Sequence, residues 1–371
     1  MADYGIFLLE ALTIVVAILL VVAGMAAIAG RNKKSEEGHI SVEKVNDELE
    51  QYEEALKESL LDKEFLKQQQ KDKEKADKEK AKQLKKEAKE KAKAAKAESK
   101  KSVKETSETE SVEEDEESKR RVFVLDFDGD IKASDVDFLR EEITAVLTMA
   151  RKQDEIVVRL ESGGGMVHSY GLAASQLQRI KDKEIPLTVC IDKVAASGGY
   201  MMACLADKIV AAPFAIVGSI GVVAQLPNFN KILKKNDIDF ELFTAGEYKR
   251  TVTMFGENTD KAKEKFQSDL EETHVLFKNH VSRFRPKLDI EKVATGDVWY
   301  GIDALDQDLI DEVGTSDDYV VAACNDADVF EVSYELKKTL QEKLGIAVQA
   351  GVEKAMTRFL TMIQHQYHNK S

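Results

Sequence analysis

A serine set among small residues is the side chain best placed for nucleophilic chemistry. The stretch Pro186–Gly221 contains an apolar strand pattern at Leu187–Ile191, a small-residue turn at Ala195–Gly199 and an apolar helix pattern at Tyr200–Leu205. Ser197 lies in this turn, just before the helix N-terminus, where free N–H groups and the helix dipole favour a developing negative charge. This setting suits a nucleophile and half of an oxyanion hole. The alternative is that Ser197 only caps the helix and that the glycines serve packing.

A run of three glycines, Gly163–Gly165, could supply the other half of an oxyanion hole. It follows the apolar strand pattern Glu155–Leu160, and in open α/β sheets the working loops lie at the carboxyl ends of strands. Gly164 and Ser197 can therefore face one another. We expect a backbone N–H of Gly163–Gly165 to point at a substrate carbonyl oxygen together with the N–H of Gly198, where each such donor contributes about 3–4 kcal/mol. A simple flexible turn is the alternative.

A serine nucleophile also needs a base, and the sequence offers two kinds. His168 lies beside the glycine run, so Ser-His catalysis stays open, whereas His274 and His280 are not spaced as a zinc pair on one helical face. A lysine can also serve, because burial favours the neutral amine that accepts a proton. Lys249 lies among aromatic and β-branched residues in Phe243–Phe255, although composition alone rates it as a surface lysine.

The surrounding chain alternates strand and helix patterns. Apolar strands are expected at Arg121–Phe127, Glu155–Leu160, Leu187–Ile191 and Lys208–Ala212. Helices are expected at Asp135–Arg151, with Ser134 as its cap, and at Ser169–Lys181, Thr259–Arg285 and Tyr334–Gln364. This alternation predicts an α/β fold in which helices cover a parallel sheet.

The net charge and the cysteines of the 371 residues limit the possible partners and cofactors. The formal net charge of −14 argues against a nucleic-acid partner. The three cysteines form no metal knuckle or disulfide framework, and Cys190 and Cys204 are expected to be buried thiols. No metal or nucleotide motif occurs in the sequence, so we predict no cofactor.

The N-terminal region is predicted to cross a lipid bilayer. Residues 11–30 carry no charge, and about 20 apolar residues span the hydrocarbon core as a helix. A cleaved signal peptide is the weaker alternative, because Asp3 and Glu10 are acidic and no basic segment precedes the apolar run. Basic residues directly after the span favour a cytoplasmic location for the rest of the chain.

Four regions follow from these patterns. Residues 1–30 are expected to be a transmembrane anchor, and residues 31–120 a charged stalk, partly helical and partly disordered. Residues 121–330 form the globular domain, and residues 331–371 are expected to be a helical extension.

Five blocks of the globular domain resemble the signal peptide peptidase A / SohB family of bacterial membrane serine peptidases. They occur in the order of that family and cover most of residues 121–318: Glu161–Gly171, Asp192–Asp207, Ile209–Phe229, Thr244–Thr259 and Val293–Asp318. Two positions depart from the family pattern. Gly163 stands where proline is frequent, and Asp308 stands where glycine is frequent, which we expect to affect a turn.

The resemblance implies a Ser-Lys dyad on a Clp protease/crotonase-like fold. Ser197 would be the nucleophile, Lys249 the general base, and Ser219 the hydroxyl that holds the lysine amine. Gly198 and Gly164 would form the oxyanion hole. In related enzymes serine and lysine can come from neighbouring subunits, so a ring-shaped homo-oligomer is also implied.

The implied function is a membrane-anchored serine endopeptidase that cleaves small membrane-associated or signal-type peptides through an acyl-enzyme. The implied location is the bacterial inner membrane with a single-pass anchor. The better-known relatives of this family work on the periplasmic side, whereas the basic flank favours the cytoplasm, so both orientations stay open. A crotonase-type acyl-CoA enzyme and a non-catalytic membrane scaffold are the rival functions, since a fold does not fix a function.

Overall fold

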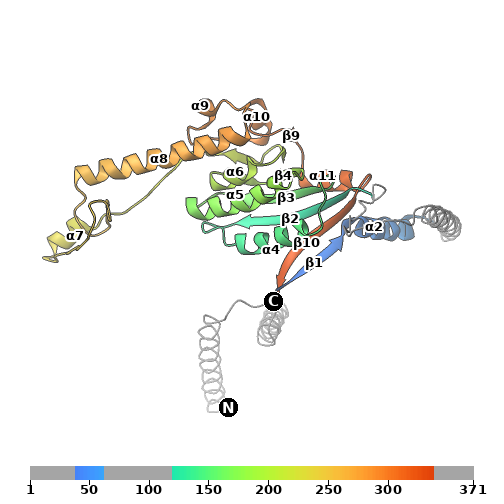
Figure 1. Cartoon of the computed structure of the whole chain (residues 1–371), viewed down its shortest axis with the longest axis horizontal. Coiled ribbons are helices and arrows are strands. Elements are labelled where there is room, and N and C mark those ends of the chain that lie inside the picture. The colour runs from blue at the N-terminus through green and yellow to red at the C-terminus, as the bar shows by residue number, and fades with distance from the viewer. Residues whose placement is uncertain (1–37, 62–118, 338–371) are drawn as a thin grey trace, which may run out of the picture. The chain divides into compact units, whose positions relative to one another are not determined.

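The computed structural model describes residues 38–61 and 119–337 (Figure 1). The chain divides into two compact units, Val42–Ser333 and Met1–Ser41 together with Tyr334–Ser371. In the smaller unit, the backbone N–H of Gly38 donates to the Tyr334 hydroxyl at 2.9 Å.

The fold is mixed α/β, as predicted. Its strands are β1 (Gly38–Lys44), β2 (Arg121–Gly129), β3 (Glu155–Ser162), β4 (Leu187–Ile191), β5 (Val194–Ala196), β6 (Lys208–Ala211), β7 (Ile216–Gly218), β8 (Val298–Tyr300), β9 (Glu312–Val313) and β10 (Asp328–Leu336). Its helices are α2 (Val45–Leu60), α4 (Val136–Leu147), α5 (Val167–Asp182), α6 (Gly198–Ala203), α7 (Asn230–Lys235), α8 (Asp260–Phe284), α9 (Ile290–Val293), α10 (Gly301–Asp306) and α11 (Ser316–Ala323).

The sheet of the larger unit is parallel along the order β10-β2-β3-β4-β6-β9. A branch leaves it at β3, where β5 pairs in parallel with both β3 and β7, and β8 then pairs antiparallel with β7. This branch matters for function because it brings the ends of β3, β5 and β7 together.

Each face of the sheet buries a different set of side chains, because neighbours along a strand point to opposite faces. The Phe127 ring meets Tyr170 of α5 edge to face at 6.5 Å, which places this set on the face covered by helices (Figure 1). On the other face, Val122, Val124 and Cys190 form one buried cluster with α11.

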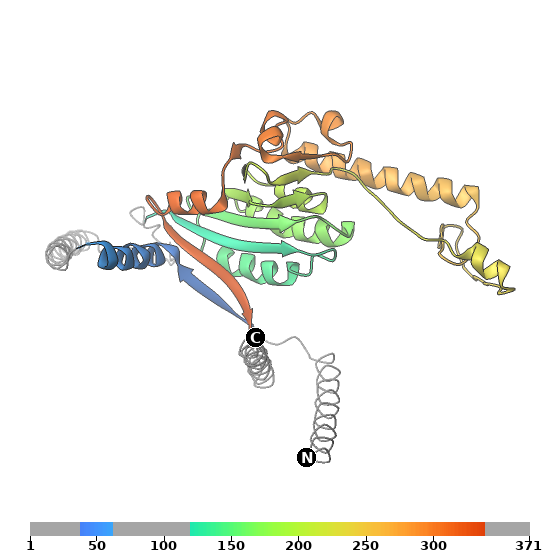
Figure 2. The same ribbon diagram turned by 180° about the vertical axis from the view of Figure 1, so that it is seen from behind.

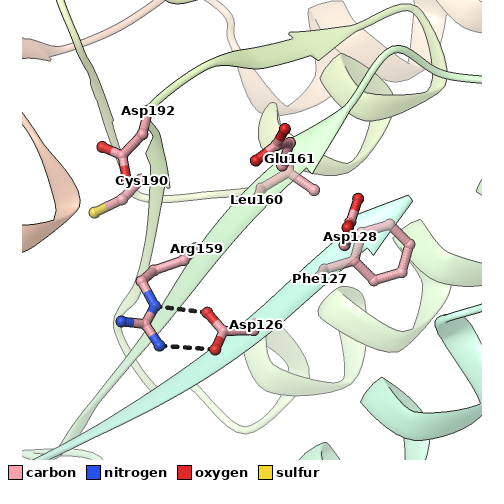
Figure 3. Close-up of a pocket in the computed structure, with 8 residues that line it drawn as sticks. All are labelled: Asp126, Phe127, Asp128, Arg159, Leu160, Glu161, Cys190 and Asp192. Atoms are coloured by element: carbon pink, nitrogen blue, oxygen red, sulfur yellow. Dashed lines mark hydrogen bonds and ion pairs between the residues drawn. The ribbon is translucent and has the colours of Figure 1, made fainter. Parts of the chain in front are cut away.

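Beyond α11 the second face is open and charged. The Arg159 guanidinium donates to both oxygens of Asp126, at 2.5 and 2.7 Å, and lines a surface pocket with Asp128, Glu161 and Asp192 (Figure 3). Arg159 also pairs with Glu331 of β10. These contacts tie β2, β3 and β10 together across the exposed part of the sheet.

Asn46 attaches helix α2 to the globular domain. Its side-chain amide donates to the carbonyl oxygens of Cys324 and Ala327 at 3.1 Å each, and its oxygen accepts the N–H of Val329 at 2.8 Å. Val45 packs against the α11 cluster. Part of the segment that composition marks as a stalk is therefore held on the domain.

A buried carboxylate, Asp154, is hydrogen-bonded to the first residue of β2. Asp154 is fully buried and accepts hydrogen bonds from the side chains and backbone of Arg121 and Arg151. Burial alone would raise the pKa of Asp154, but the hydrogen bonds from Arg151 and Arg121 outweigh it and hold the pKa well below its usual value.

The cysteines behave as the sequence predicts. Cys190 and Cys204 are buried free thiols, and Cys324 is partly exposed. Burial raises the pKa of the Cys190 thiol to about 12 and also raises that of Cys204.

Two local predictions are wrong. Ser134 does not cap α4, because its hydroxyl donates to the Asp130 carboxylate at 2.9 Å and the helix begins after Asp135. The expected helix from Tyr334 is also wrong at its start, because Tyr334 lies in β10, where apolar and polar residues alternate. The rest of that expected helix lies outside the described residues.

Among residues 38–61 and 119–337, no helix is both long and apolar enough to cross a bilayer. The predicted span at residues 11–30 lies outside the described part of the chain.

Candidate active site

Ser197 occupies a strained turn between β5 and α6. Its φ of 52° and ψ of −114° lie in a region that residues with a side chain rarely adopt, at a cost of about 1–3 kcal/mol. The turn is held because the Ser197 N–H donates to Gly218 O at 2.8 Å and the Met201 N–H donates to Ser197 O at 2.9 Å. The Ser197 side chain makes no capping hydrogen bond, so the helix-cap interpretation is wrong.

The glycine run lies directly against this turn. Gly164 has φ +85°, and a Cβ there would lie 2.7 Å from Gly198 N and 2.8 Å from the Ser197 Cβ. Only glycine allows this approach. The sequence expectation that Gly164 and Ser197 face one another thus agrees with the geometry.

The N–H of Gly164 has a partner inside the protein. It donates to Ser162 Oγ at 3.0 Å. Gly165, the next residue, lines the same cavity as Ser197 and Gly198, and its N–H has no hydrogen-bond partner within the described residues. Sequence reasoning did not single out Gly165, because three consecutive glycines look alike until their N–H directions are known.

Ser219 lies beside Ser197 at the end of the adjacent strand. Ala196 and Gly218 are register partners in β5 and β7, and parallel neighbours lie about 4.8 Å apart, so the serines that follow them are close. Ser219 also has a positive φ, of 50°, and its N–H donates to Asp297 O at 2.6 Å. The branch of the sheet therefore brings four predicted site residues together: Ser197, Gly198, Gly164 and Ser219.

A mostly apolar cavity of about 190 Å³ opens beside Ser197. Its walls come from the glycine loop, α5, α6, the segment after β7 and the C-terminal half of α8, with these side chains: Val167, Met201, Val222, Thr273, Leu276, Phe277 and His280. Such a cavity can hold an apolar side chain next to the serine oxygen.

The histidines near the site are tied to main-chain carbonyl groups. His280 Nε2 lies 2.9 Å from Met201 O, and His274 Nε2 lies 3.3 Å from Ile220 O. A carbonyl oxygen can only accept, so each nitrogen donates and is not available as a base. Burial lowers the pKa of His280, which fits this neutral, donating role. His168 is exposed on the first turn of α5.

Lys249 lies at the other end of α8 from Ser197. Tyr248 and Arg250 line a pocket with Thr259, Lys261 and Ala262, and the amine of Lys265 lies 5.7 Å from the Tyr248 ring centre.

The Ser197 cavity instead touches α8 at Thr273–His280. At about 1.5 Å per residue, the eight positions from Lys265 to Thr273 place the two contact regions at least about 12 Å apart along the helix. Within residues 38–61 and 119–337 no hydrogen bond joins Ser197 to Lys249, and the Ser197 cavity and the neighbours of Lys249 meet different parts of α8.

The segment that carries Lys249 extends away from the sheet (Figures 1 and 2). We call residues 223–259 the arm. Asn228 orders it by donating to the carbonyl oxygens of Thr253 and Gly256 at 2.9 and 3.0 Å, and the Phe229 and Phe255 rings stack at 6.0 Å.

The arm nevertheless exposes many large apolar side chains. Phe243 is 87% exposed and Val223 is 81% exposed. Others that are exposed are Leu226, Phe229, Ile232, Ile238, Phe240, Leu242 and Tyr248. Clustered exposed apolar groups of this kind mark interaction surfaces.

Within residues 38–61 and 119–337, no group of three or more histidine, cysteine, aspartate or glutamate side chains is placed to hold a metal ion.

Asp308, which stands where the family pattern frequently has glycine, lies in a turn, as expected, with φ 57°.

Comparison with known proteins agrees with the sequence resemblance. Two family models match: Peptidase family S49 N-terminal over residues 1–177 and Peptidase family S49 over residues 179–329. A Haemophilus influenzae protein described as a probable protease SohB is 48% identical over 365 residues, covering 97% of this chain and 96% of that protein.

A Buchnera aphidicola (subsp. Acyrthosiphon pisum) protein with the same description is 52% identical over 241 residues, covering 65% of this chain and 72% of that protein. A solved membrane-bound stomatin-specific protease mutant in complex with a substrate peptide has a TM-score of 0.37 and 15% identity, and covers 62% of this chain and 98% of its own.

Proposed function

Since the chain belongs to peptidase family S49, we propose that it is a membrane-anchored serine endopeptidase in which Ser197 forms an acyl-enzyme. The observation that carries this proposal is the strained Ser197 turn, which lies at a helix N-terminus beside an apolar cavity and whose hydroxyl makes no hydrogen bond to the described residues. A strained serine at a strand-to-helix turn is the arrangement used by other serine nucleophiles.

The proposed reaction begins when the Ser197 oxygen attacks a peptide carbonyl and its proton passes to the amine of Lys249. Gly198 supplies one N–H to the oxyanion, and the glycine loop supplies the second. Gly164 was the sequence candidate for that second donor. Because its N–H already meets Ser162 Oγ, the free N–H of Gly165 is the better candidate.

Protonated Lys249 then donates to the leaving amine, and water hydrolyses the ester on Ser197. Ser219, which follows the strand next to the nucleophile, would hold the lysine amine. This assignment requires the amine to enter a site that its own chain does not reach.

A second copy of the chain would bring that amine. The separation of Ser197 from Lys249 along α8 supports a dyad made by two subunits, and the apolar arm supports a contact between them. Covering the arm would also remove water from Lys249, and desolvation favours the neutral amine. Repetition of this head-to-tail contact would close a ring-shaped homo-oligomer on a Clp protease/crotonase-like fold.

Membrane anchoring and substrate class complete the proposal. Residues 11–30 would anchor the protein in the bacterial inner membrane, and the substrates would be small membrane-associated or signal-type peptides. The apolar cavity beside Ser197 supports cleavage next to apolar residues, because it can desolvate such a side chain.

The test uses the full chain in detergent, an internally quenched apolar peptide and a fluorophosphonate probe for reactive serines. Ser197→Ala and Lys249→Ala should each reduce hydrolysis by at least about a thousandfold. Lys263→Ala, which removes an exposed α8 lysine paired with Asp260, is the matched control and should hydrolyse normally. A Ser197→Ala protein that still cleaves at the normal rate would refute the assignment, and a wild type without cleavage or labelling would favour a scaffold.

A further inference from the structure

A pair of buried hydroxyl groups lies beneath the candidate site and takes no part in the proposed reaction. Ser162 ends β3 and is 2% exposed, and Tyr170 lies in the first turn of α5 and is fully buried. Their oxygens are 2.5 Å apart. Burial raises the pKa of Tyr170, so its hydroxyl stays protonated.

The hydrogen bonds around this pair run in one direction. Ser162 Oγ accepts the N–H of Gly164 at 3.0 Å, and the Tyr170 hydroxyl donates to Asp130 O at 2.7 Å. Each hydroxyl has one proton to give. Because the Tyr170 hydroxyl donates its hydrogen bond to Asp130 O, the Ser162 hydroxyl is the donor in the bond between Ser162 and Tyr170. A chain then links the glycine loop to the end of β2: Gly164 N–H to Ser162, Ser162 to Tyr170, and Tyr170 to Asp130.

The Tyr170 ring touches the other side of the site as well. A Cβ on Gly198 would lie 2.4 Å from the ring, and a Cβ on Gly129 would lie 2.5 Å from its hydroxyl oxygen. Tyr170 therefore contacts Gly198, which follows Ser197, and through Ser162 it also fixes the glycine loop.

We propose that Ser162 and Tyr170 are positioning residues that set the spacing between the Gly198 N–H and the N–H groups of the glycine loop. This inference rests on the proposed peptidase function. Without the Ser162 hydroxyl, the Gly164 N–H would lose its partner and the loop could rotate toward the cavity. Without the Tyr170 hydroxyl, Ser162 would turn its proton toward Gly129 O, which lies 3.3 Å away.

The test compares two inhibitors with the same peptide part. Acetyl-Leu-Leu-leucinal has an aldehyde carbon to which the Ser197 oxygen bonds, so that its carbonyl oxygen becomes an oxyanion. Acetyl-Leu-Leu-leucinol cannot form that bond and reports peptide binding alone. The ratio of the two inhibition constants therefore measures stabilisation of the oxyanion.

Ser162→Ala and Tyr170→Phe should each reduce the preference for the aldehyde by about tenfold or more, with binding of the alcohol unchanged. In hydrolysis, kcat should fall while KM stays nearly constant. Tyr200→Phe is the matched control, because Tyr200 is also fully buried and its hydroxyl donates to Leu309 O at 2.8 Å, away from the loop. It should keep the full preference for the aldehyde.

An unchanged aldehyde preference in both Ser162→Ala and Tyr170→Phe would overturn this inference while leaving the peptidase proposal intact. A merely structural role would lower thermal stability in all three variants and change both inhibition constants alike, which would also overturn it. A wild type that does not distinguish the aldehyde from the alcohol would refute the peptidase proposal together with the inference.

Discussion

Replacing Gly164 with alanine would put a methyl group into the close contact between the glycine loop and the Ser197 turn. The new Cβ would lie 2.7 Å from Ala196 O, 2.7 Å from Gly198 N and 2.8 Å from the Ser197 Cβ. These are backbone atoms and the first side-chain carbon of Ser197, so none can move aside by rotating a side chain. The loop or the Ser197 turn must shift instead.

The expected size of the effect follows from two terms. A left-handed residue with a Cβ costs about 1–2 kcal/mol, and forcing an extra carbon into a packed site costs about 1–3 kcal/mol. Gly164→Ala should thus lower the free energy of unfolding by about 2–5 kcal/mol. A shift of the Gly198 N–H should reduce kcat by about 10²–10³, the loss seen when one oxyanion donor is removed.

The assay is peptide hydrolysis and fluorophosphonate labelling of the folded variant, with thermal unfolding measured on the same sample. Gly163→Ala is the matched control, since a Cβ at Gly163 meets nothing within 4 Å and its φ is not positive. It should keep activity and stability. A Gly164→Ala protein that hydrolyses peptide within threefold of the wild type would refute the claim that this contact sets the site.

Three further predictions concern the rest of the domain. Asn46→Ala removes three hydrogen bonds at about 1 kcal/mol each, so α2 should lose about 2–3 kcal/mol of protection in hydrogen exchange, while the sheet stays protected. Asp154 has a lowered folded pKa, so it stabilises the fold above its unfolded pKa of about 3.9, and this contribution is lost as the pH falls toward the folded value. Asp154→Asn should cost about 3 kcal/mol at pH 7 and flatten the acid limb of a stability-against-pH curve; an unchanged acid limb would contradict the assignment. A thiol reagent should modify only Cys324 rapidly in the native protein, and fast modification of Cys190 or Cys204 would contradict their burial.

Local sequence patterns predict most of the domain correctly. The alternating strands and helices follow from apolar periodicity, and α8 runs from Asp260 to Phe284 as its spacing predicts, with the Thr259 side chain accepting the Ala262 N–H. The turn at Ser197 and its glycine neighbour are also visible in sequence, because small residues are needed where backbones approach closely.

Other features depend on contacts that no local pattern encodes. Sequence spacing does not tell that α8 separates Ser197 from Lys249, because a long helix can carry a loop toward a site or away from it. The Ser162–Tyr170 pair was missed because both residues fit a strand end and a buried helix face without any special role. The pattern predicts a cap at Ser134, whereas the turn brings the Asp130 carboxylate to its hydroxyl, a contact that no local pattern encodes.

Because the two residues of the proposed dyad lie apart in one chain, subunit mixing tests the proposal most directly. Ser197→Ala and Lys249→Ala would be co-expressed with different tags, and assemblies containing both would be purified through the two tags in turn. If each site takes serine from one copy and lysine from its neighbour, random mixing regenerates about one quarter of the sites. A dyad shared between subunits predicts about that fraction of wild-type peptide hydrolysis, and mixed assemblies that hydrolyse no faster than either variant alone would contradict it.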